Sequence, residues 1–119
     1  MERIETTILR NLVFDEDYAR KVIPFIQPDF FEVSTEKTIF QEIVHFIVKY
    51  NSNITLEALQ IEIENRTDLT EEEIKQSREI VISLHSSLVD AQWLLDTTEK
   101  WCRDRAISLA LMESIHIAD

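Results

Sequence analysis

The chain has 119 residues, no glycine and one cysteine, and its formal net charge is −11. A P-loop, a dinucleotide-binding turn and an EF-hand each need glycine where the backbone takes positive φ or approaches a ligand, so none of these sites can form here. Only 12 basic residues stand against 23 acidic ones, which argues against strong DNA binding because lysine and arginine supply much of the affinity for phosphates. The composition predicts a helical protein that works through contacts.

The bulk composition is that of a single globular domain. Hydrophobic residues make up 45% of the chain, which suffices for a core at this length. We expect no membrane segment and no secretory signal, because no apolar run is long enough and acidic residues occur early. The single cysteine cannot form an internal disulfide, so we expect a reducing setting in the cytoplasm.

The N-terminal third predicts two helices and an irregular connection. A first helix is expected over about residues 2–13, where apolar side chains recur about every four positions. Asp15 is expected to cap a second helix, which Pro24 should shorten or kink. Residues 25–31 are apolar but contain Pro28, so we expect a buried connection or one irregular turn that inserts aromatic rings into the core.

The central helix is predicted by its wide apolar surface. Ser34 is expected to cap it, and it should run to about Tyr50 with apolar residues on most of its circumference. Asn51 should end this helix in the left-handed conformation that glycine usually supplies.

Two further helix starts have clear capping signals. Thr55 is expected to cap a helix that ends near Asn65. Thr70 and Glu73 match a capping box, in which each side chain bonds the backbone N–H of the other, and this helix should reach about His85. The acidic residues 71–73 favour the positive end of the helix dipole, although they could also belong to an acidic docking face. That face would include Glu57, Glu62, Glu64 and Asp68.

The last helix should be the longest, beginning after Asp90 and continuing to the end of the chain. Residues 106–112 are apolar nearly all round, and a terminal helix cannot bury its whole circumference against one small bundle. We therefore expect a helical head over residues 1–89 and a terminal helix over 90–119 that exposes apolar residues. The side chains expected to contact another molecule are Trp101, Ile107, Leu111, Met112 and Ile115.

The sequence gives little support for a catalytic or metal-binding site. The three histidines lie on different predicted helices without the spacing of metal ligands, and Cys102 is expected to be an inert packing residue. Trp93 and Trp101 are eight residues apart, which suggests a similar side of the last helix. We expect no catalytic, cofactor-binding or metal-binding residue in this chain, and no enzymatic activity of its own.

Several segments follow one another in a characteristic order: 8–15, Tyr18, Val22-Ile23-Pro24-Phe25, Pro28-Asp29-Phe30-Phe31, 38–43 and 98–106. This order resembles the N-terminal domain of DnaB-like replicative helicases, above all those that work with primase in T-even-like phages. One departure is Arg10, at a position of the first helix where bacterial members usually have glycine.

The resemblance implies an all-α bundle of about five or six helices followed by a helical hairpin. The last helix would be the first arm of that hairpin, and the second arm would lie beyond Asp119. The motor that binds ATP and Mg²⁺ would lie further along the helicase, outside this chain. In such helicases the N-terminal domains form a collar on the hexameric ring, pair with one another and contact primase.

The net charge leaves a second interpretation open. A freestanding acidic helical protein could occupy a nucleic-acid site on a host protein as a DNA mimic, provided that its carboxylates lie on one face at about the spacing of phosphates. Self-association and primase contact follow from the first interpretation, and competition with DNA follows from the second.

Overall fold

The computed structural model describes residues 2–87 and 89–118, and the side chains of residues 2–87 and 89–114. Over these residues the chain is all-α, as expected, with six α-helices, two short 3-10 helices and no strand. In chain order they are α1 (Ile4–Phe14), α2 (Glu16–Val22), η1 (Ile23–Phe25), η2 (Pro28–Phe30), α3 (Ser34–Tyr50), α4 (Leu56–Glu64), α5 (Glu71–Ser83) and α6 (Ala91–Ala118).

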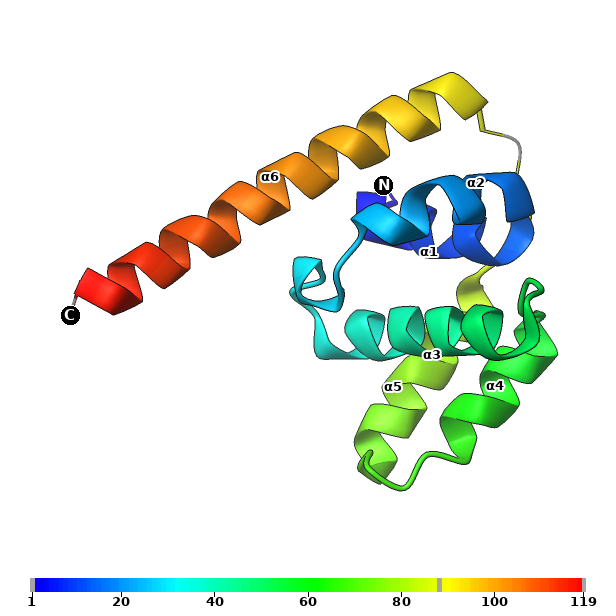
Figure 1. Cartoon of the computed structure of the whole chain (residues 1–119). Coiled ribbons are helices and arrows are strands. Elements are labelled where there is room, and N and C mark those ends of the chain that lie inside the picture. Colours follow the sequence, from blue (N-terminus) through cyan, green and yellow to red (C-terminus); the bar gives the residue numbers. More distant parts are fainter. Residues whose placement is uncertain (1, 88, 119) are drawn as a thin grey trace.

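Helix α3 is the centre of the bundle. It contacts α1 and η2 as well as α4 and α5, which confirms that a wide apolar surface marks a helix touched on several sides. Helices α4 and α5 form an antiparallel pair below α3, and α1 and α2 lie above it (Figure 1). Helix α6 lies across α2 and η2 and then continues past the bundle (Figure 1).

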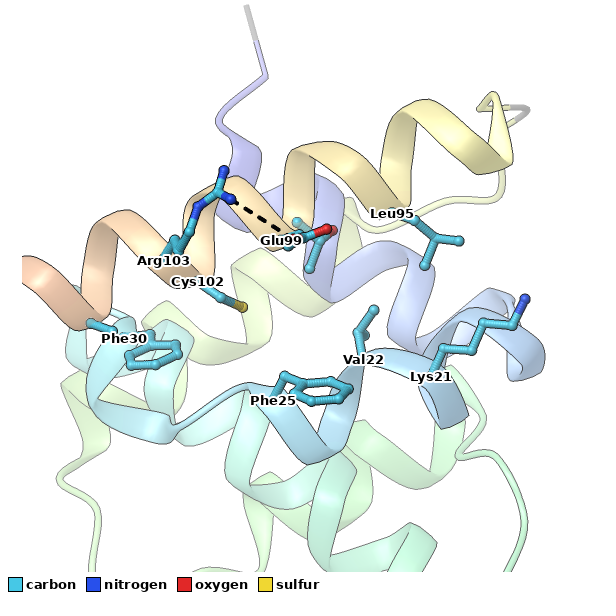
Figure 2. Close-up of a pocket in the computed structure, with 10 residues that line it drawn as sticks. Lys21, Val22, Phe25, Phe30, Leu95, Glu99, Cys102 and Arg103 are labelled. Atoms are coloured by element: carbon cyan, nitrogen blue, oxygen red, sulfur yellow. Dashed lines mark ion pairs between the residues drawn. The ribbon is translucent and has the colours of Figure 1, made fainter.

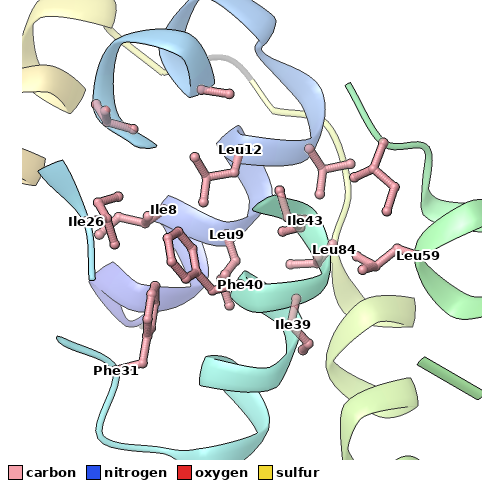
Figure 3. Packing of buried hydrophobic residues seen from close by; sticks show 14 of the residues in the cluster. Ile8, Leu9, Leu12, Ile26, Phe31, Ile39, Phe40, Ile43, Leu59 and Leu84 are labelled. Carbon is pink, nitrogen blue, oxygen red and sulfur yellow. The ribbon is translucent and has the colours of Figure 1, made fainter. Parts of the chain in front are cut away.

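The core lies mainly between α1 and α3. Three fully buried side chains of α1 face three of α3, and Phe31 and Leu59 close the two ends of this layer (Figure 3). The facing residues are Ile8, Leu9 and Leu12 on α1 and Ile39, Phe40 and Ile43 on α3. Because apolar burial is the main driving force for folding, this layer holds the head together.

Side-chain caps define the helix boundaries where glycine is absent. The Asp15 carboxylate accepts from the Tyr18 N–H at 3.1 Å, and Asn51 takes the left-handed conformation with φ of 51°. Thr70 and Glu73 form both bonds of the capping box, at 3.1 and 3.0 Å. Thr55 and Asp90 also cap as expected, so most predicted boundaries are confirmed.

One predicted cap is wrong. Ser34 is the first residue of α3, and the N-cap position is occupied by Val33, whose side chain cannot accept a hydrogen bond. The sequence therefore placed the cap one residue too late. Helix α3 can begin without a side-chain cap because its packing in the bundle stabilises it.

The connection between α2 and α3 follows the prediction except at one ring. Helix α2 ends at Val22, and Pro24 lies in the 3-10 turn η1. Phe30 and Phe31 are buried as expected, whereas Phe25 is 72% exposed. The expectation for Phe25 was wrong because η1 turns its ring away from the core and towards α6 (Figure 2).

The capping box gives a direct test of these boundaries. Thr70→Ala removes the acceptor for the Glu73 N–H and should lower the free energy of unfolding by about 1 kcal/mol in urea titrations followed by circular dichroism. Ser34→Ala is the matched control, since Ser34 makes no capping bond, and should change it by less than about 0.5 kcal/mol. Equal losses in the two variants would contradict this assignment.

Candidate interaction surface

The first half of α6 is anchored to the bundle through Trp101. Its ring lies 5.9 Å from Phe30 in an edge-on arrangement and 5.0 Å from Phe31, and the residue is 7% exposed. Arg105, one turn further on, donates from Nε to the Phe30 carbonyl at 2.7 Å and pairs with Glu32 at 2.9 Å. Apolar packing and a charge-assisted bond thus fix α6 to η2 and to the segment after it.

A second anchor joins α6 to α2. The hydroxyl groups of Tyr18 and Thr98 lie 2.7 Å apart, and both residues are buried. Burial raises the pKa of Tyr18 well above its usual range, so its hydroxyl stays protonated at neutral pH and remains able to donate. Leu94, one turn earlier, is 2% exposed and completes the buried side of α6.

Beyond Arg105, α6 gradually leaves the bundle while its apolar residues continue, and Leu109 is the last of them that still packs against the core. Ile107, Leu111 and Met112 are 57%, 59% and 64% exposed. Met112 follows Leu94 by 112 − 94 = 18 residues, which is five turns of about 3.6 residues, so it continues the buried side of the helix past its partners. Ile107 and Leu111 lie one turn apart on another side, so the projecting part of α6 (Figure 1) exposes apolar groups around its axis.

The structure separates the five side chains that the sequence grouped as an interface. Ile107, Leu111 and Met112 lie together on the projecting part of α6, whereas Trp101 packs inside the bundle. Ile115 lies outside the residues whose side chains the structure describes. Trp93 is 51% exposed and does not share a side with Trp101, because eight residues turn a helix by two turns and about 80°.

A groove runs along the first half of α6, on the side that faces α2 and η1. Its volume is about 540 Å³. Phe25 and Val22 line one wall, and the α6 residues of the other wall are a helical turn apart (Figure 2). The α6 wall consists of Leu95, Thr98, Glu99, Cys102, Arg103 and Ala106, while Phe30 closes one end and Lys21 stands at the other. The sequence analysis missed this groove, because it expected Phe25 in the core.

The groove has an apolar interior and a charged rim. Cys102 is half-buried in its wall, and burial raises the pKa of its thiol, so the thiol is protonated at neutral pH. Glu99 and Arg103 pair with each other along the rim at 3.8 Å. Such a groove suits apolar contacts and gives no nucleophile.

Acidic side chains of α3, of α4 and of the loop between α4 and α5 are paired within the head. Arg66 bonds Asp68 and lies 3.3 Å from Glu42, and Arg78 lies 2.7 Å from Glu64. The hydrogen bond from Arg66 lowers the pKa of Asp68. These contacts, with the capping bond of Glu73, give several of the acids a structural role in the bundle.

The described residues support neither metal binding nor membrane insertion. Among the described side chains, no group of three or more histidine, cysteine, aspartate or glutamate residues could hold a metal ion. No described helix combines the length and apolar character needed to cross a bilayer.

These features define the class of the chain as an all-α domain that exposes an apolar groove and three apolar side chains near the end of its long last helix. No protein-family model matches the chain. It is 33% identical over 110 residues to the DnaB-like replicative helicase of Enterobacteria phage T4, a match that covers 92% of the chain. The resemblance inferred from the segment order is thereby confirmed. The chain spans 23% of the length of that helicase.

The two tryptophans of α6 test which of its sides is buried. Trp101→Ala should lower the free energy of unfolding by about 3–5 kcal/mol, because it leaves a cavity against Phe30 and Phe31. Trp93→Ala should change it by less than about 1 kcal/mol, since an exposed ring leaves no cavity. The measurement is urea denaturation of both variants, and a Trp101→Ala protein as stable as Trp93→Ala would place Trp101 outside the core.

Proposed function

We propose that this chain is the assembly domain of a phage replicative DNA helicase. In this proposal the domain contributes to a collar on the hexameric ring, holds helicase subunits together through α6, and contacts primase. ATP hydrolysis, with its Mg²⁺, belongs to another part of the helicase. The observation that carries the proposal is the projecting end of α6, with three exposed apolar side chains on a helix that is firmly anchored at its other end.

Two independent lines support this function. The similarity to the phage T4 helicase extends over nearly the whole chain and so concerns the domain as a unit. Exposed apolar side chains on a projecting helix are typical of surfaces that another molecule covers. The first line indicates replication, and the second indicates contact between proteins.

The alternative of a freestanding DNA mimic rests on the net charge alone. A charge of −11 agrees with both functions, because it also keeps a small domain in solution. The similarity to a replicative helicase favours the assembly function, whereas the DNA mimic has only the net charge in its favour. We therefore retain the assembly function as the conclusion.

Substitution of the projecting residues tests self-association. Each fully covered Ile or Leu side chain contributes roughly 1.5–3 kcal/mol, so Ile107→Glu with Leu111→Glu should weaken self-association of the chain by about 100-fold or more in sedimentation equilibrium. The matched control is Val48→Glu with Ile82→Glu, which changes two exposed apolar residues on α3 and α5. Association that is equally strong in both double variants would refute the role of α6.

A chimera tests the role in replication. In the chimera, this chain replaces the matching part of the phage T4 helicase. Ring assembly, DNA unwinding and stimulation by primase are then measured. We expect a hexamer that unwinds DNA, and loss of the hexamer when Ile107→Glu and Leu111→Glu are introduced. A chimera that assembles and unwinds normally with those two substitutions would contradict the proposal, and displacement of DNA from a host protein by the chain alone would favour the mimic.

A further inference from the structure

We propose that the outer face of the α4–α5 pair is a docking site for a basic amphipathic helix of another protein. This outer face is the side turned away from α3, and four side chains define it: Ile61 and Glu64 on α4, and Arg78 and Ile82 on α5. It lies across the head from α6 (Figure 1), so the inference does not depend on the assembly function proposed for that helix.

Ile61 and Ile82 both interrupt the apolar pattern of their helices. On α4, Leu59 and Ile63 are buried, and a residue two positions from each points to the opposite side, since each residue turns a helix by about 100°. Ile61 is accordingly 56% exposed. On α5, Val81 is fully buried and its neighbour Ile82 is 63% exposed. Isoleucines at these two positions add little to the core, whereas they suit a surface that another molecule covers.

An ion pair between the two helices shows that both isoleucines lie on one face. The Arg78 Nε atom lies 2.7 Å from the Glu64 Oε1 atom. Ile61 lies three residues before Glu64, and Ile82 lies four residues after Arg78, so each is about one turn from the ion pair. Because α4 and α5 run antiparallel, both steps lead in the same direction. The two isoleucines therefore lie at the same level of the outer face.

The surroundings of the two isoleucines are strongly acidic. Residues 56–83 contain 8 acidic and 3 basic side chains, which is a balance of −5 in fewer than a quarter of the residues of the chain. Glu57 lies one turn from Ile61, and Glu79 lies one turn from Ile82. Both carboxylates are exposed, and neither makes an ion pair within the residues that the structure describes. Charge complementarity therefore selects a partner that carries lysine or arginine.

The shape of the face favours a helix as the occupant. A third helix can pack across two antiparallel helices, as it does in helical bundles. From Glu57 to Glu64, α4 extends about 10 Å at 1.5 Å per residue, which two turns of a partner helix would span. An apolar side chain at every third or fourth position would contact Ile61 and Ile82, and basic side chains beside it would meet Glu57 and Glu79.

Binding of a designed peptide tests this site. The probe is a synthetic peptide that repeats Leu-Lys-Lys-Leu-Leu-Lys-Lys twice and carries a fluorophore, and its binding to the chain is measured by fluorescence anisotropy. A scrambled peptide of the same composition, whose leucines do not share a face, measures attraction by charge alone. We expect the amphipathic peptide to bind at least about tenfold more tightly, since only it presents an apolar face to the isoleucines. In NMR spectra of the labelled chain, the largest shift changes should fall around Ile61 and Ile82.

A pair of matched variants tests the apolar contact. Ile61→Ser with Ile82→Ser leaves the charge unchanged and should weaken binding of the amphipathic peptide at least about tenfold. The control is Val48→Ser with Trp93→Ser, which changes two exposed apolar residues on α3 and α6 and should alter binding by less than about twofold. Circular dichroism and urea titration of each variant verify that the head remains folded.

A second pair of variants tests the charge. Glu57→Gln with Glu79→Gln should weaken binding at least about threefold at low salt, and by less at high salt, where charges are screened. The control is Asp17→Asn with Glu113→Gln, which removes the same charge from exposed positions on α2 and α6. It should weaken binding by less than about twofold at the same low salt concentration.

Several results would overturn the inference. These are equal binding of the two peptides, equal losses within either pair of variants, and shift changes that are largest on α6 or around Phe25, which would place the peptide in the groove. Loss of self-association in the Ile61→Ser, Ile82→Ser variant would make the face an interface between copies and would also overturn it. Ile107→Glu with Leu111→Glu should not weaken peptide binding, so this inference and the function of α6 can fail separately.

Discussion

The interaction on which the molecule depends is the packing of Trp101 against Phe30 and Phe31, together with the bond from Arg105 to the Phe30 carbonyl. These contacts hold one point of a stiff rod, since an α-helix of 28 residues bends little over its length. Beyond Arg105 only Leu109 still packs against the core, and the end of the helix projects from the head. The exposure of Ile107, Leu111 and Met112 follows from this anchor, and so does the groove on the near side of α6.

The absence of glycine shapes the head as well as limiting its chemistry. A helix end that would normally use glycine at positive φ uses Asn51, and helix starts depend on Asp, Thr and the capping box. These side chains hold the short loops between helices in defined conformations. Loops held in this way give the projecting helix a defined direction relative to the head.

Local signals in the sequence were sufficient for most of the fold, whereas the surfaces needed the three-dimensional arrangement. Caps such as Thr70 act within one turn, so they can be recognised from adjacent residues. Trp101 was predicted to contact another molecule but is buried, whereas Phe25 was predicted to lie in the core but is exposed. An apolar side chain on a terminal helix is buried or exposed according to where the helix leaves the bundle, and periodicity does not report that position. The exposed ring of Phe25 depends on the 3-10 turn at Pro24, which the sequence indicated only as a short or kinked helix.

Hydrogen–deuterium exchange of the wild-type chain at low and high protein concentration tests the central claim most directly. Backbone amides of residues 94–105 should be protected at both concentrations, because the bundle itself anchors this part of α6. Those of residues 106–114 should exchange rapidly in dilute protein and become protected as the concentration rises. Equal protection of residues 106–114 at every concentration would show that the chain needs no second molecule to cover this helix, and would contradict the account.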